Sequence, residues 1–182
     1  MYQMILTILS VLYINSSWAT IGRDQPDNIP SLLTHALIIG ADINGTILYL
    51  CRGKLFNSVQ PGKTWAGYNR CNVPYEGKEY IVNEFVIPDQ REFGHFSWGQ
   101  GWREAIAIGK NTAGKPLFLC RSSFQGTTQP GKTWEGYNHC NISFAGREII
   151  TDNYRVLVNR NKVRIHTAPI QSRSNNLHTD YR

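Results

Sequence analysis

Short apolar runs, each bounded by Gly, Pro or Asn, alternate with polar turns along most of the chain. The clearest case is a pair of runs, ALIIGAD (36–42) and TILYLCR (46–52), on either side of Asn44-Gly45. Asn-Gly between two such runs is the strongest short-range signal for a β-hairpin, because both central residues of a type I′ turn need positive φ. No window after residue 19 shows a convincing 3.6-residue period, so the pattern predicts antiparallel strands rather than helices.

Two further strands are predicted after this hairpin. A Gly- and polar-rich loop comes first and ends in Pro-Gly-Lys, whose lysine is Lys63. We then expect a short strand at CNVPY (71–75), a turn at Glu76-Gly77 and a longer strand at KEYIVNEFVI (78–87).

The whole pattern occurs twice, at an offset of 69 residues, because QPGKTWAGYNRCN (60–72) recurs as QPGKTWEGYNHCN (129–141). In a tandem duplication of this kind, each copy is one supersecondary unit that does not bury its apolar face alone. The aromatic-rich connection 88–103 is expected to pack between the copies. We therefore predict an all-β fold, in which two tandem pseudo-symmetric antiparallel β repeats, 27–90 and 91–158, form one compact domain.

The two ends of the chain differ from the repeats. Residues 1–19 contain an apolar stretch from Met4 to Ile14 and then Ser17-Trp18-Ala19, which is typical of a secretory signal peptide cleaved near Ala19, although no Lys or Arg precedes the stretch. The stretch is too short to span a bilayer, and a buried N-terminal strand or an uncleaved anchor is the alternative. A cleaved signal would make the protein secreted or periplasmic. Residues 159–182 form a polar basic tail, which we expect to be disordered.

Composition and charge exclude two classes of protein. With 182 residues, 41% of them apolar and only 18% charged, the chain is too hydrophobic to be disordered and suits one domain. The tail 159–182 holds five basic residues against one acidic residue, so most of the formal net charge of +6 lies there. A near-neutral body does not resemble a nucleic-acid-binding surface, and we expect no nucleic-acid partner.

The four cysteines fall into two equal intervals. Cys51 and Cys71 are 20 residues apart, and so are Cys120 and Cys140. Equal spacing favours one disulfide within each copy among the three possible connectivities, and each would stabilise a secreted chain by about 3 kcal/mol. Four buried thiols in paired strands are the alternative. We predict no metal site, because no Cys-x-x-Cys or nearby His pair supplies the spacing of zinc ligands.

No arrangement of residues indicates an enzyme. A glycosidase needs two carboxylates about one glycosidic bond, but Glu79 and Glu148 are equivalent positions of the two repeats. We expect them to hold a turn or to pair with Arg52 and Arg121. No His arrangement suggests a triad and there is no nucleophile elbow. We therefore expect a protein that is not an enzyme and uses no cofactor.

Binding is better supported than catalysis. A lysine after Pro-Gly offers three donors from a stiff turn, and the carboxylate of an Asp-x-Asn-Gly turn offers acceptors. Such a pair can hold two vicinal hydroxyls of a sugar through charge-assisted hydrogen bonds. A flat apolar face for the sugar ring could come from Trp65, Tyr68, Trp134 and Tyr137, which could equally be core residues.

These motifs resemble a known repeat. The sequences ALIIGADINGTILYLCR, QPGK and CNVPYEGKE are similar to the DM-nine repeat, which occurs in an oyster mannose-binding lectin and in the N-terminal part of natterin-type proteins. The resemblance covers both copies, about residues 27–158, and includes Trp98. It implies an all-β protomer of two intertwined pseudo-symmetric repeats and a tendency to form homodimers.

The resemblance also implies the site residues. Mannose would be held chiefly by the Asp of the first turn and the Lys of Pro-Gly-Lys, which are Asp42 and Lys63 here. In the second copy Lys132 is retained, but Asn111 stands in place of the aspartate, so that site is expected to lack a carboxylate. A Glu shortly before Pro-Gly-Lys in the lectin is absent, and Ser58-Val59 fill that stretch.

We predict a secreted carbohydrate-binding protein that recognises mannose-type glycans through Asp42 and Lys63. The alternative is a non-catalytic structural or protein-interaction module built of the same repeats. In that case Asp42 would simply cap its own hairpin as an Asx-type turn, and Lys63 would be an exposed loop charge.

Overall fold

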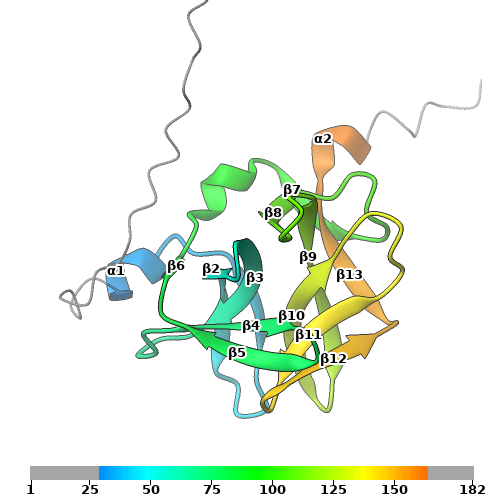
Figure 1. Cartoon of the computed structure of the whole chain (residues 1–182). Coiled ribbons are helices and arrows are strands. Elements are labelled where there is room, and N and C mark those ends of the chain that lie inside the picture. The colour runs from blue at the N-terminus through cyan, green and yellow to red at the C-terminus, as the bar shows by residue number, and fades with distance from the viewer. Residues whose placement is uncertain (1–28, 164–182) are drawn as a thin grey trace, which may run out of the picture.

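The computed structural model describes residues 29–163 of the chain (Figure 1). Strands of the first copy are β1 (Ile38–Ala41), β2 (Ile47–Leu55), β3 (Ser58–Thr64), β4 (Cys71–Tyr75), β5 (Lys78–Val82) and β6 (Phe85–Val86). Strands of the second copy are β7 (Phe96–Gly99), β8 (Ala107–Lys110), β9 (Pro116–Phe124), β10 (Thr127–Thr133), β11 (Cys140–Phe144), β12 (Arg147–Thr151) and β13 (Tyr154–Asn159). Three short helices complete it: α1 (Ile29–Leu33), the 3₁₀ helix η1 (Gln90–Phe93) and α2 (Arg160–Val163).

The all-β prediction is confirmed, and the strands form an antiparallel barrel with extra strands. The predicted signal peptide 1–19 lies outside the described residues. Residues 159–163 of the predicted tail belong to β13 and α2, and the rest of that tail lies outside the described part. None of the helices in the described part has the length and apolar character needed to cross a lipid bilayer.

The two copies exchange strands, as the resemblance implied. Each copy has a long central hairpin, β2–β3 in the first and β9–β10 in the second. β1 of the first copy pairs with β10 of the second, and β8 of the second copy pairs with β3 of the first. In Figure 1 the cyan and green strands of the first copy therefore lie among the yellow and orange strands of the second. Neither copy completes its sheet alone.

The Pro-Gly-Lys segments lie inside β3 and β10, so the prediction that they end a loop is wrong. β3 pairs with β8 at Val59 and with β4 at Lys63, and Pro61 lies between these two positions. Because proline has no N–H to donate, it is tolerated where the strand changes its neighbour. The exchange also needs glycine, since a Cβ on Gly109 would lie 2.0 Å from the Val59 carbonyl oxygen.

One hydrophobic cluster joins the copies, and two smaller clusters lie beside it. The central cluster contains buried side chains of both copies, including Leu50 and Leu119. Phe93 is buried in it, and Phe96 and Trp98 pack against it, so the connection between the copies packs as expected. The smaller clusters each contain one disulfide bond.

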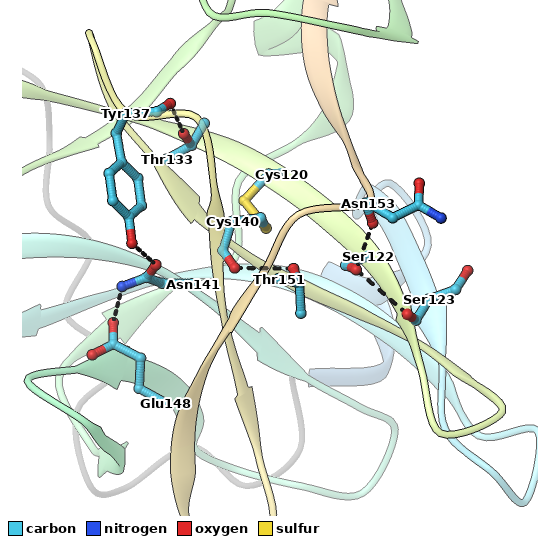
Figure 2. The surroundings of a disulfide bond; sticks show 10 residues. All are labelled: Cys120, Ser122, Ser123, Thr133, Tyr137, Cys140, Asn141, Glu148, Thr151 and Asn153. Carbon is cyan, nitrogen blue, oxygen red and sulfur yellow. Dashed lines mark hydrogen bonds between the residues drawn. A yellow bond between two sulfur atoms is a disulfide. The ribbon is translucent and has the colours of Figure 1, made fainter.

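Both predicted disulfides are present. Cys51 is bonded to Cys71 and Cys120 to Cys140, with Cα–Cα distances of 5.9 and 6.0 Å. No cysteine in the described residues is free. Figure 2 shows the second bond, which joins β9 to β11, together with the polar residues around it. Two disulfides are typical of proteins that fold in an oxidising compartment.

Candidate functional site

Lys63 on β3 carries its ammonium into the boundary between the two copies. Its Nζ donates to Gln129 Oε1 at 2.7 Å and to the Ser143 carbonyl at 2.5 Å, and lies 3.2 Å from Glu79 Oε1. Gln129 and Ser143 belong to the second copy. Lys63 is only 7% exposed, so the interpretation of it as an exposed loop charge is wrong.

Lys132 on β10 repeats this arrangement in the opposite direction. Its Nζ donates to Gln60 Oε1 at 2.9 Å and to the Pro74 carbonyl at 2.6 Å, and lies 3.4 Å from Glu148 Oε1. The Tyr75 ring lies with its centroid 5.0 Å from Nζ, within cation–π range. Each lysine therefore uses its three donors mainly on the other copy.

The two glutamates beside these lysines also connect the copies. Glu79 Oε2 accepts a hydrogen bond from the Gly146 N–H at 2.8 Å, and Glu148 Oε2 accepts one from the Gly77 N–H at 2.7 Å. The expectation that these glutamates hold a turn is correct, but each holds the turn of the other copy. Ion pairs and turn contacts thus cross the boundary between the copies in both directions, and we call them the crossed network.

The expected pairing of these glutamates with Arg52 and Arg121 is wrong. Arg52 pairs with Glu92 at 3.1 Å. The Arg121 guanidinium lies over the Trp98 ring, 4.1 Å from its centroid. Arg52 lies opposite Pro61 in the β2–β3 hairpin, and Arg121 lies opposite Pro130 in the β9–β10 hairpin.

A relay of polar side chains supports each glutamate. In the second copy, the Tyr137 hydroxyl donates to Asn141 Oδ1 at 2.9 Å, and Asn141 Nδ2 donates to Glu148 Oε1 at 3.0 Å (Figure 2). Trp134 stacks on Tyr137 with ring centroids 3.8 Å apart. The equivalent residues of the first copy make the same contacts: Trp65, Tyr68, Asn72 and Glu79.

Burial shapes the charges of the network. Desolvation lowers the pKa of Lys63, and the charges of Glu79 and Asp42 oppose this shift. Desolvation would by itself raise the pKa of Glu79, but Lys63, the Gly146 N–H and the Asn72 amide together hold it below its usual value. Glu79 is thus fixed as an anion. The Lys63 ammonium is already out of water. A ligand hydroxyl that replaces one of the acceptors of Lys63 therefore removes little further water from the ammonium.

A cavity of about 310 Å³ opens beside Lys132. It is lined by residues from both copies: Gln60, Tyr75, Glu76, Asn111, Leu117, Lys132, Trp134, Asn141 and Glu148. Two of the predicted site residues, Lys132 and Asn111, are therefore brought together. Trp134 offers an aromatic surface in the same cavity.

We expected this second site to lack a carboxylate, but Glu76 lines its cavity. It comes from the β4–β5 turn of the first copy, and its charge raises the pKa of Lys132 against the effect of burial. The equivalent position in the second copy is Ala145, which has no charge to offer Lys63. Each lysine thus has one further carboxylate, Asp42 near Lys63 and Glu76 near Lys132.

Asp42 is an Asx-turn residue, and the turn uses only one of its two carboxylate oxygens. Its Oδ1 accepts from the Asn44 N–H at 3.0 Å and from the Thr46 N–H at 2.9 Å. Within the described part of the chain, Oδ2 accepts no hydrogen bond. Asn111 makes the same two turn contacts through Oδ1, which leaves an amide donor where Asp42 leaves an acceptor.

Sequence reasoning missed several residues of the site. Gln60 and Gln129 precede Pro-Gly-Lys in both copies, and this repetition was a usable signal. Glu76 gave no such signal, because its counterpart is Ala145. Across the described residues, no group of three His, Cys, Asp or Glu side chains could hold a metal ion.

Fold and site together define a tandem-repeat β-protein with polar, lysine-containing sites at the boundary between its copies. A family model for the DM9 repeat matches residues 22–82 and 42–151. The chain therefore belongs to the DM9 repeat family, and the resemblance seen in the sequence is confirmed. This family is known for carbohydrate binding. A search of curated proteins found no match.

Proposed function

We propose that the protein is a secreted, non-catalytic lectin that binds mannose-type glycans at the boundary between its two repeats. The observation that carries this proposal is the pair of buried lysines, each of which feels the charge of a further carboxylate, Asp42 for Lys63 and Glu76 for Lys132. Charged donors and acceptors side by side suit the vicinal hydroxyls of an uncharged sugar.

The cavity beside Lys132 fits this ligand class. Its volume of about 310 Å³ is at the small end of the range for small-molecule sites, which suits one sugar residue. Trp134 supplies an apolar face for a sugar ring, and Asn111 and Glu76 supply a donor and an acceptor. In the first copy, Asp42 Oδ2 and Lys63 supply the equivalent pair.

For each carboxylate, the residue at the equivalent position of the other copy shows a replacement that the fold accepts. Asp42→Asn removes the carboxylate but keeps the hairpin, because Asn111 already makes both turn contacts. Glu76→Ala removes the second carboxylate, and Ala145 shows that alanine accepts the positive φ of that turn, 49° against 46° for Glu76. Both variants should therefore fold as the native protein does.

The experiment is a calorimetric titration with methyl α-mannoside, preceded by a glycan array. Each substitution should weaken binding at its own site by about tenfold, because a hydrogen bond to a charged group is worth roughly 1–2 kcal/mol more than a neutral one. The Asp42→Asn, Glu76→Ala double variant should lose binding at both sites. Unchanged affinity in the folded double variant would refute the proposal, and a folded native protein with no array signal would favour a protein-interaction module.

An exposed apolar pair supports the homodimer that the resemblance implied. Ile81 and Ile150 are repeat equivalents on β5 and β12 and are 57% and 60% exposed. A dimer across this face would display several sites at once and raise avidity for branched glycans. Sedimentation analysis of an Ile81→Ser, Ile150→Ser variant tests this, and a native protein that is monomeric at high concentration would contradict it.

Secretion is part of the same proposal. The two disulfides favour an oxidising compartment. Mass spectrometry of the secreted protein should place the mature N-terminus at Thr20, after cleavage near Ala19. Retention of the native protein inside the cell with an intact N-terminus would contradict this part.

A further inference from the structure

Two arginines face each other on neighbouring strands at a second cavity. Arg121 on β9 and Arg155 on β13 are directly opposite in the antiparallel register. Neither forms an ion pair with a carboxylate in the part of the chain that the structure describes. Like charges at directly opposed positions destabilise a sheet. Lys78 and Arg147 form another such pair, but only Arg121 and Arg155 line this cavity.

The first copy lacks this pair. At the equivalent position, Arg52 lies opposite Val86, and Glu92 neutralises it at 3.1 Å. The second copy therefore has an arginine where the first copy has a valine, and Arg121 lacks an acidic partner such as Glu92 provides for Arg52. The duplication shows that the fold itself needs neither the second cation nor an unpaired one.

The arginines open onto a cavity of about 450 Å³. Ser123, Thr128 and Asn153 add polar groups to its lining. Ser122 Oγ donates to the Asn153 carbonyl at 2.7 Å, which fixes the loop at one side (Figure 2). This cavity shares no lining residue with the one beside Lys132.

Trp98 orients one of the two guanidinium groups. Arg121 lies with its guanidinium carbon 4.1 Å from the centroid of the Trp98 ring, so the group is held against an aromatic surface. Burial and the nearby charge of Arg155 lower the pKa of Arg121. A guanidinium held in this way is preorganised, and its N–H groups can bind an oxyanion bidentately.

We propose that this cavity binds a doubly charged oxyanion, sulfate or phosphate, either free or as an ester on a larger ligand. Two negative charges neutralise the two arginines that the described residues leave unpaired. The polar side chains of Ser123 and Thr128 provide further hydrogen bonds to the oxygens. The proposal uses none of the residues assigned to mannose binding, so the two proposals fail separately.

The test is an NMR titration that observes the Nε–H signals of the arginines. Sodium sulfate and sodium phosphate are added at constant ionic strength, with sodium chloride as the reference anion. Sulfate and phosphate should shift the signals of Arg121 and Arg155 with a saturating curve, and chloride should not. Equal shifts with chloride would overturn the proposal.

Two substitutions give the matched comparison. Arg155→Val copies Val86 of the first repeat and should weaken sulfate binding by at least about tenfold, since charge-assisted hydrogen bonds to the oxyanion are lost. Lys78→Gln removes the same charge from another opposed pair, Lys78 and Arg147. These residues are exposed, as Arg155 is, but they do not line this cavity. It should leave the affinity unchanged. Equal weakening by both variants, or none by Arg155→Val, would overturn the proposal.

A second variant and a comparison of ligands complete the test. Arg155→Gln, a second variant, replaces Arg155→Val if circular dichroism shows that the valine protein does not fold, and it should cause the same loss. Mannose 6-phosphate and galactose 6-sulfate, compared with the inorganic ions, distinguish an ester from a free ion as the source. Tighter binding of the esters identifies a glycan substituent, tighter binding of the inorganic ions identifies a free ion, and both results support an oxyanion site.

Discussion

Replacing Glu79 by Gln should destabilise the protein far more than the same change at a surface ion pair. Glu79 Oε1 lies 3.2 Å from Lys63 Nζ, and both side chains are 8% exposed. At that distance two unit charges attract by about 5 kcal/mol at an effective dielectric constant of about 20. Removing one partner leaves a buried charge unpaired, which typically costs about 3–5 kcal/mol.

The matched control is Glu84→Gln. Glu84 pairs with Lys54 at the shorter distance of 2.8 Å, but both side chains are 55% exposed. Water and counter-ions screen this pair, so its loss should cost about 1 kcal/mol or less. If the contact distance alone set the loss of stability, Glu84→Gln would be more destabilising than Glu79→Gln.

The assay is urea unfolding, followed by tryptophan fluorescence and circular dichroism with the disulfides intact. Glu79→Gln, Lys63→Met and the double variant complete a double-mutant cycle. The double variant should lose at least about 2 kcal/mol less than the sum of the single losses, because it leaves no unpaired charge. Additive losses, or equal losses for Glu79→Gln and Glu84→Gln, would refute the assignment of a buried, coupled pair.

Three further measurements test other parts of the structure. Replacing Cys51 and Cys71 by Ser should lower the free energy of unfolding by about 3 kcal/mol, and an unchanged urea midpoint would argue against the bond. Gly109→Ala should abolish cooperative unfolding or cost several kcal/mol, because its Cβ would lie 2.0 Å from the Val59 carbonyl oxygen; a thermal midpoint within a few degrees of the native value would contradict the exchange of strands. The lowered pKa of Glu79 contributes stability above its ordinary value of 4.5, and this contribution is lost as the pH falls through the folded value. Glu79→Gln should therefore show a shallower loss of stability below about pH 4.5, and equally steep profiles for both proteins would refute this.

The sequence predicted the local parts of the fold well. Asn44-Gly45 marked the first hairpin, and equal cysteine spacing marked both disulfides. These features depend on residues close together in the chain or on the repeat itself. The type I′ turn was wrong, because only Gly45 of this pair has positive φ. The position of Pro-Gly-Lys was missed, because Pro-Gly is typical of turns, whereas here Pro61 lies opposite Arg52 in the β2–β3 hairpin.

The candidate site was predicted only in part. The resemblance pointed to Asp42 and Lys63, but most contacts of Lys63 come from the other copy. Gln129 and Ser143 contact Lys63 across the boundary between the repeats. Local spacing contains no information about such a contact, although an identical residue at the equivalent position of both copies does hint at it.

The exchange of β1 and β8 has a consequence for synthesis on the ribosome. When the first copy emerges, β3 still has an unpaired edge at Val59, and β1 has no β10 to pair with. Lys63 then also lacks Gln129 and remains hydrated. The nascent half must stay open until the second half leaves the exit tunnel, with strand edges exposed to other chains. Translation of the second repeat, rather than collapse of the first, therefore sets the earliest moment at which this protein can fold.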